Sequence, residues 1–408
     1  MLQSSPTVRA LFAVPDYRRL WTIGALVGVV RWLEFLALGV FAYQVTQSPT
    51  YVALIALVRM APWIVLGFLI GALADYFDKQ RMLAAGFLVS GVAFAAMAVL
   101  SAFGLAGYGT AICAALVSGL LWTTDLPVRR RLLVEAAGVH RMTAALGFDN
   151  SSYFAARAIG PILGGVAYQL LGIEGIFALS AAVYLACFYL SVGLTDVEPS
   201  PTDRAHVGNP RPSVLSLLIP PRELILSRRF QVVVGVTIVF NVWCFPFLSM
   251  VPVIGEKEFG LTPAQIGALS ACEGVGGTIG AILIGLLAGQ RPYFPFYYFG
   301  VMGFLALMLG VSVSLTLGTT IVGLLLIGAS ASGFSAVQYA LIYTMAPPDM
   351  RGRAAGFLSI YIGTSTLGFY NTGWVFSRFE TADAMMIIAL EGLIPLVILG
   401  LLWMRAKS

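Results

Sequence analysis

A few ionisable side chains stand inside long apolar stretches of this chain. They are Arg31, Glu34, Arg59, Asp149, Arg157, Glu273 and Glu391. An ionised side chain at the centre of a bilayer costs on the order of 3 kcal/mol, so each one needs a charged partner or a water-filled cavity. The sequence therefore predicts buried ion pairs, proton-binding carboxylates or ligand contacts at these positions.

Glu34 is open to two interpretations. Arg31 and Glu34 are i, i+3 neighbours, so they fall on one face of a helix. In the first interpretation Glu34 accepts a proton and its charge is balanced by Arg31 or Arg157, because desolvation and a nearby arginine act on a carboxyl in opposite directions. In the second, Arg31 and Glu34 form a permanent salt bridge that only neutralises two buried charges.

Glu273 has the same ambiguity in the second half of the chain. It is either a substrate or proton contact, or a polar residue bonded to a neighbouring helix. Asn150 and Asn241 add amide groups inside apolar stretches, and several aromatic residues accompany them, among them Trp32, Trp122, Tyr153 and Phe245. An apolar pocket with a few placed polar groups suits a large aromatic or amphipathic organic molecule.

The elements that must position these residues are membrane-spanning helices. Of the 408 residues 59% are hydrophobic and only 11% are charged, whereas soluble domains carry about 25% charged residues. Twelve apolar segments begin near residues 20, 50, 82, 107, 144, 173, 230, 262, 293, 318, 353 and 382. We therefore expect an all-α membrane protein with 12 transmembrane helices.

A proline- and arginine-rich stretch divides the segments into two sets of six. It predicts a bundle over residues 1–194, a cytoplasmic linker over 195–229 and a second bundle over 230–408. Residues 213–227 within it favour a piece lying on the membrane surface. The two sets also match in position, since a loop of the form Gly285-Leu-Leu-Ala-Gly289-Gln-Arg291 follows the eighth segment as a similar loop follows the second.

The basic residues give an orientation and exclude other classes of protein. Nearly all fall on one side of the predicted helices, which places both termini in the cytoplasm and accounts for the net charge of +5 without nucleic acid. The four cysteines lie in apolar segments and the two histidines in loops, so no metal site is expected. We find no phosphate-binding loop and no catalytic constellation, so we expect neither a cofactor nor an enzyme.

The loop after the second segment reads Gly71-Ala-Leu-Ala-Asp75-Tyr-Phe-Asp78-Lys79-Gln-Arg81. This pattern resembles the signature loop of the major facilitator superfamily. In that superfamily a basic residue usually occupies the position of Tyr76, and a glycine often occupies the position of Asp78. The stretches 16–21, 46–48 and 59–62 are similar to the bacterial efflux branch that includes the enterobactin exporter and macrolide pumps. The resemblance implies two pseudo-symmetric six-helix bundles that rock around a central cavity, with Arg31, Glu34, Arg59, Arg157 and Glu273 toward the pathway.

The fifth segment carries Gly160-Pro161-Ile-Leu-Gly164-Gly165, which resembles the antiporter motif of this superfamily. The motif favours exchange and export, and the alternative is a kinked packing helix. Around the predicted inner gate we expect Asp125 to cap a helix or latch to nearby arginines. We expect Arg129 to Arg131, Arg351 and Arg353 to face lipid and the other domain, as gate charges beside Lys79 and Arg81.

The functional hypothesis is proton-coupled export of a small organic molecule, a siderophore or drug-like compound, from a bacterial cytoplasm. The expected partners are this substrate, protons and membrane lipids, and we expect a monomer in the inner membrane. An importer or facilitator and a lipid transporter of the same fold are alternatives. A transport-inactive sensor or assembly protein is the alternative from another class.

Overall fold

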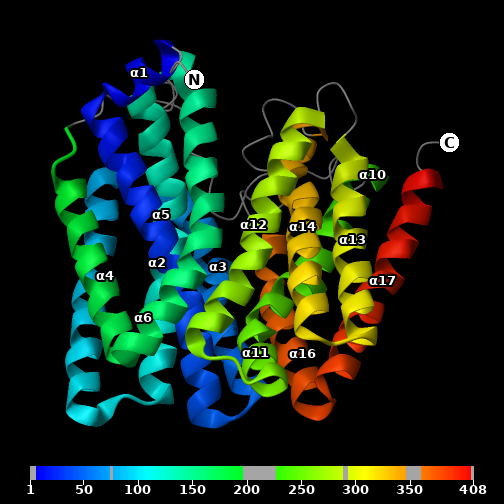
Figure 1. The fold of residues 1–408 in the computed structure, drawn as a ribbon. Helices are drawn as coiled ribbons and strands as arrows, with labels where there is room; N and C mark the ends of the chain where they lie inside the picture. The colour runs from blue at the N-terminus through cyan, green and yellow to red at the C-terminus, as the bar shows by residue number, and fades with distance from the viewer. Residues whose placement is uncertain (1–5, 74–76, 196–226, 288–292, 346–359, 406–408) are drawn as a thin grey trace.

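A computed structural model describes residues 6–73, 77–195, 227–287, 293–345 and 360–405, and its helices stand side by side (Figure 1). The first half contains α1 (Pro6–Phe12), α2 (Pro15–Thr46), α3 (Pro49–Leu73), α4 (Lys79–Leu100), the π-helix η1 (Ser101–Leu105), α5 (Tyr108–Ala137), the 3-10 turn η2 (Val139–Arg141) and α6 (Met142–Val192). Prolines begin α2 and α3, because the first helical turn needs no backbone N–H from them.

The second half has the same all-helical character. It contains α10 (Arg228–Val239), the π-helix η3 (Phe240–Cys244), the 3-10 helix η4 (Phe245–Met250), α11 (Val251–Phe259), α12 (Pro263–Leu287), α13 (Tyr293–Val313), α14 (Leu317–Met345), α16 (Ser365–Arg378) and α17 (Thr381–Arg405). One continuous helical span runs from Arg228 to Phe259, and it consists of α10, η3, η4 and α11.

In the described part of the chain, nine helices are long and apolar enough to cross a membrane. The all-α membrane fold is confirmed. The number twelve stays a prediction, because α3 ends at a range that is not described, α16 has only 14 residues and α6 counts as one helix. Residues 196–226 also lie outside the described ranges, so the predicted linker, its surface segment and the bundle boundaries stay predictions.

Helix α6 folds back on itself at Gly172. Its 51 residues would reach about 76 Å if straight, more than twice the hydrocarbon core. Gly172 has φ 65° and ψ −170°, a conformation open to glycine and costly for other residues. Both ends of α6 meet the start of α2, since Tyr17 donates to the Ala145 carbonyl and the Thr195 backbone N–H donates to Asp16.

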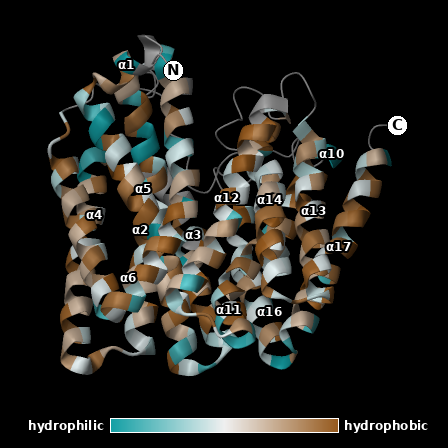
Figure 2. Cartoon of the chain, in the orientation of Figure 1, coloured by the Kyte–Doolittle hydropathy of each residue, from teal (hydrophilic) through white to brown (hydrophobic). Residues whose placement is uncertain are grey.

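The two halves form neighbouring groups of helices, and both chain ends lie at the same end of the molecule (Figure 1). We call this end the termini side and the opposite end the far side. Apolar colouring runs along the outer helices and hydrophilic colouring gathers toward their ends (Figure 2). Large apolar side chains such as Leu170, Phe299 and Ile394 are exposed, as lipid-facing residues would be. Which side faces the cytoplasm stays a prediction.

Among the described residues, the two groups are in contact on the far side. Helix α2 starts on the termini side, so Gly39 near its other end and Thr50 at the start of α3 lie on the far side. A methyl group at Gly39 would stand 3.2 Å from Pro252 of α11. The Thr50 hydroxyl donates to the Gly373 carbonyl of α16 over 3.2 Å. The described state is thus closed by helix packing on the far side.

Glycines also let α12 and α14 touch backbone to backbone. A Cβ atom at Gly276 would overlap the carbonyl oxygen of Leu325, and one at Gly328 would overlap that of Glu273. Small residues at such crossings give membrane helices their van der Waals attraction, because lipid provides no hydrophobic drive between helices. The backbone position of Glu273 depends on this crossing.

We predict that Gly276→Ala destabilises the protein by about 1–3 kcal/mol, the usual cost of overpacking a tight contact. The measurement is the thermal unfolding midpoint in detergent. Gly310→Ala is the matched control, since Gly310 of α13 is exposed and a methyl group there meets no atom within 4 Å. Equal midpoints for the two variants would contradict the close approach of α12 and α14.

Candidate functional site

Glu34 and Arg59 form a buried pair between α2 and α3. Their side chains are 0% and 1% exposed, and Arg59 Nη2 lies 3.5 Å from Glu34 Oε2. The Tyr184 hydroxyl of α6 donates to Glu34 Oε1 over 2.8 Å, and the Ser118 hydroxyl of α5 donates to Oε2. Arg59 also donates to the Arg31 carbonyl over 2.8 Å. The pair is therefore enclosed within the first half of the molecule.

Arg31 pairs with Asp125 rather than with Glu34. Arg31 Nη2 lies 3.1 Å from Asp125 Oδ2, and Arg129 Nε lies 3.3 Å from Asp125 Oδ1. Arg129 also forms a salt bridge with Asp149, in which Nη1 lies 2.5 Å from Oδ1. A permanent Arg31–Glu34 bridge is thus not what the structure contains, because each residue turns to a partner on another helix. Asp125 acts as a latch to arginines, one of its two expected roles.

The arginine run of α5 differs from expectation. Arg129 was expected to face lipid, and it is buried between Asp125 and Asp149 with its side chain 4% exposed. Arg130 Nε lies 3.0 Å from Asp149 Oδ2, so only part of the run reaches the surface. Successive helical residues are about 100° apart, so three neighbouring arginines cannot share one environment.

Arg157 and Glu273 join the two halves of the molecule. Arg157 Nε and Nη2 of α6 donate to the two carboxylate oxygens of Glu273 on α12 over 2.8 and 2.7 Å. The side chains are 14% and 6% exposed. Such bidentate arginine–carboxylate pairs combine charge with fixed geometry. Glu273 follows the start of α12 by ten residues, about 15 Å, so the pair lies midway through the helix bundle.

An aromatic cluster surrounds these arginines. Arg157 lies 4.9 Å from the ring centre of Trp32, and Arg31 lies 4.7 Å from that of Trp122. Trp122 also packs edge-on against Trp32 and Trp63 at 6.4 and 6.2 Å. The three buried indole N–H groups have no hydrogen-bond partner among the described residues. The cluster therefore offers ring faces and unused donors, which suits an aromatic molecule carrying acceptor oxygens.

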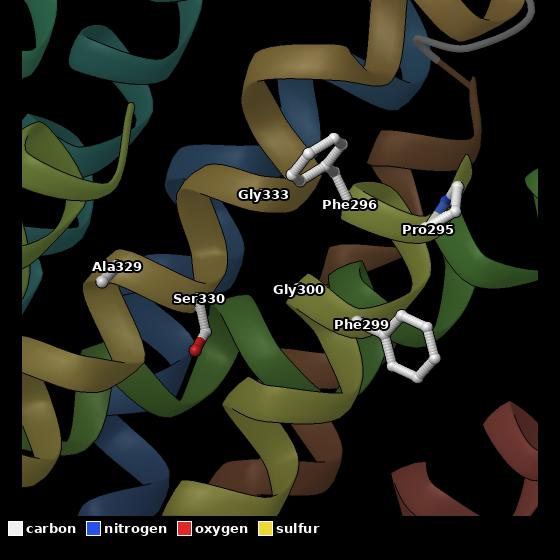
Figure 3. Close-up of a pocket in the computed structure, with 7 residues that line it drawn as sticks. All are labelled: Pro295, Phe296, Phe299, Gly300, Ala329, Ser330 and Gly333. Atoms are coloured by element: carbon white, nitrogen blue, oxygen red, sulfur yellow. The ribbon is translucent and has the colours of Figure 1, made fainter. Parts of the chain in front are cut away.

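Space at this site is small in the described state. A cavity of about 30 Å³ lies between Trp32, Arg157 and Glu273, and one of about 10 Å³ lies beside Arg59. A larger hollow of about 500 Å³ lies between α13 and α14, lined by Phe296, Phe299 and Ser330 among others (Figure 3). Its lining is nearly all apolar and holds no charged residue, so we do not assign the chemistry to it.

The glycine-rich motif of α6 packs this helix against two neighbours. Added methyl groups would meet Trp32 at Gly160, the Leu33 backbone at Gly164 and the Pro263 carbonyl at Gly165. The first two neighbours belong to α2 and the third to α12. The carbonyl of Pro161 likewise faces Gly267 of α12. The motif thus brings Arg157 within reach of Glu273, and its role in exchange stays a prediction.

The other predicted residues are placed apart from this pair. Lys79 bonds to Glu135 at 2.5 Å, and Arg81 is exposed beside Asp78, which caps α4. Asn150 accepts from Arg130, and Asn241 donates to the Thr237 carbonyl of its own helix. Gly71 belongs to α3, and Asp75, Arg351 and Arg353 lie outside the described residues.

Two hydrogen-bond partners of Glu34 were not predicted from the sequence. Ser118 and Tyr184 are hydroxyl residues in apolar stretches of two other helices, and only the folded chain brings them to Glu34. Their polarity within apolar runs was the available signal, and many packing residues share it. Among the described residues no three His, Cys, Asp or Glu side chains gather as a metal site requires.

Comparison with solved structures identifies the fold. A bacterial homologue of the lysosomal transporter Spinster, in an inward-facing and occupied state, matches with a TM-score of 0.71 at 13% identity, covering 96% of each chain. A D-xylose–proton symporter matches with a TM-score of 0.70 at 14% identity, covering 93% of this chain and 96% of its own. At these identities the likeness concerns the fold alone.

Sequence relatives are transporters as well. The staphyloferrin A transporter of Staphylococcus aureus is 23% identical over 69% of each chain. The enterobactin exporter EntS of Shigella dysenteriae serotype 1 is 27% identical over 70% of this chain and 67% of its own. The sequence model of the Major Facilitator Superfamily matches residues 20–369. This match covers most of the apolar segments and both residues of the Arg157–Glu273 pair, and the chain therefore belongs to the major facilitator superfamily of membrane transporters.

Proposed function

We propose that this protein is a proton-coupled exporter of a small organic molecule, a siderophore or an amphipathic drug-like compound, in a bacterial inner membrane. The named activities of the staphyloferrin A and enterobactin relatives support the substrate class. The aromatic cluster with its unused N–H donors supports a flat molecule with acceptor oxygens.

The observation that carries this proposal is the bidentate Arg157–Glu273 pair. It ties α6 to α12 halfway through the bundle. Opening the far side requires α6 and α12 to separate, and separation would leave two charges without partners in an apolar setting. Breaking a buried pair in this way costs about 3–5 kcal/mol. The pair therefore locks the empty transporter.

Two events can release this lock. A proton on Glu273 removes the charge that holds Arg157, and a substrate with an acceptor oxygen can take the guanidinium of Arg157 instead. Trp32 lies under Arg157, so a ring bound there would be next to the same guanidinium. Either ligand frees α6 from α12 while the empty carrier stays locked. Alternating release by proton and substrate is the condition for exchange of one for the other.

Glu34 is better suited to a structural role than to proton exchange. It is fully buried and held by Arg59, Ser118 and Tyr184, all within the first half. Glu273 instead borders a cavity and bridges the halves. The coupling carboxylate that we propose is therefore Glu273, and the Glu34–Arg59 pair is a fixed part of the first bundle.

We predict that Glu273→Gln uncouples transport from protons. In proteoliposomes with a panel of siderophores and amphipathic drugs, the variant should still move its substrate down a gradient. A pH difference drives uphill accumulation of substrate in the wild type, and in the variant this accumulation should fall at least tenfold. The reason is that glutamine neither pairs with Arg157 as an ion nor exchanges a proton.

Glu273→Asp is the matched control, since it keeps the carboxyl group and should keep part of the uphill accumulation. A Glu273→Gln variant that accumulates substrate as the wild type does would refute the coupling role. Uphill uptake in the direction of an importer would instead favour the importer alternative, and binding without any movement would favour the sensor.

For the Glu34–Arg59 pair we predict strong non-additivity. Glu34→Gln and Arg59→Met should each lower stability by about 3–5 kcal/mol, because each leaves one buried charge unpaired. The double variant should be more stable than the sum of the single losses requires. The measurement is the unfolding free energy or midpoint in detergent, and additive losses would contradict a direct pairing.

A further inference from the structure

A carboxyl group in the second half is held by neutral donors alone. Glu391 of α17 accepts from Asn371 Nδ2 of α16 over 2.6 Å and from Trp243 Nε1 of η3 over 3.0 Å, both at Oε2. Oε1 has no hydrogen bond within the described ranges. Glu391 follows the start of α17 by ten residues, about 15 Å, which places it midway through the helix.

Glu391 differs in this respect from four buried acids inside the spans. Each of these four has an arginine within 4 Å, namely Glu34, Asp125, Asp149 and Glu273. No Lys, Arg or His of the described chain lies within that distance of Glu391. An ionised carboxyl at this depth would carry its full charge against two neutral donors, and such a charge is costly in a membrane protein interior.

The elements packed against Glu391 bring no nearby cation. On α13 the facing titratable group is Tyr298, whose hydroxyl donates to the Leu396 carbonyl of α17. Along their helices, Arg228 of α10 lies about 20 Å from Trp243, Arg378 of α16 about 10 Å from Asn371, and Asp383 about 12 Å from Glu391. Arg378 instead stacks over Trp374 at 4.7 Å.

We propose that Glu391 is a second proton-binding site, in which the carboxyl is neutral in the described state and carries its proton on Oε1. A neutral carboxyl suits the donors present, because its carbonyl oxygen accepts from Asn371 and Trp243 while its hydroxyl is left to exchange. Glu391 is only partly buried. The π-helix η3, which carries Trp243, is a type of distortion frequent at functional sites.

This site shares no residue with the Arg157–Glu273 pair. It adjoins the far-side closure, because α16 carries both Asn371 and Gly373, whose carbonyl bonds to Thr50 of the first half. A glycine also brings α16 against η3, where a methyl group at Gly368 would overlap the Val242 carbonyl. The proton is thus bound where one helix contacts both halves.

The test is infrared spectroscopy of the purified protein at neutral pH, which reads the protonation state without transport. The wild type should show a carboxylic acid carbonyl band that is missing from the spectrum of Glu391→Gln. Asn371→Leu should shift this band to higher frequency, because the carbonyl oxygen loses a hydrogen bond. Glu380→Gln is the control, since Glu380 is exposed beside Lys257 and its removal should lose a carboxylate band.

Loss of a carboxylate band in Glu391→Gln would overturn the proposal, as would an unchanged acid band in Asn371→Leu. Should Glu391→Gln fail to fold, Glu391→Asp serves the same purpose, because it should move the acid band and leave the carboxylate bands unchanged. Neither result depends on proton coupling through Glu273, so the two proposals can fail separately.

Discussion

The structure depends on one constraint, which is that a charge inside an apolar bundle must have a partner. In the first half the constraint is met internally, since Glu34, Asp125 and Asp149 take up Arg59, Arg31 and Arg129 from neighbouring helices. These pairs fix how α2, α3, α5 and α6 face each other. Arg157 is the exception, because its partner Glu273 belongs to the other half. A pair placed there must be broken whenever the halves separate.

The helices that carry the Arg157–Glu273 pair are closely packed. Glycines of α6 and α12 allow backbone contact at Gly165 and Gly267, and Gly328 of α14 supports the backbone at Glu273. In the proposed mechanism, α6 and α12 separate along this crossing once the Arg157–Glu273 ion pair is released. A ligand shifts such an equilibrium only by its differential affinity for the two states. In the proposed mechanism, protons and substrate acquire that difference through Arg157 and Glu273.

The sequence predicted the membrane fold and the charged residues inside the helices more reliably than it predicted the partners of these charges. Composition and apolar length identify the helices, and rare charges within them identify Arg31, Glu34, Arg59, Arg157 and Glu273. Pairing depends on helix rotation and on contacts far apart in the chain. The i, i+3 spacing therefore suggested Arg31 with Glu34, whereas Asp125 and Arg59 are the true partners. Glu391 was assigned to a supporting helix, and only the fold revealed its lack of a cation.

The most direct test of the lock is a distance measured across the far side. Spin labels at the exposed positions Leu170 and Ser377 report on the first and second halves, and pulsed electron resonance gives their separation. We predict a short distance for the empty wild type at neutral pH and an additional population with a longer distance under acid conditions. Glu273→Gln should show the longer population at both pH values. A distance that neither acid nor Glu273→Gln changes would contradict the Arg157–Glu273 lock.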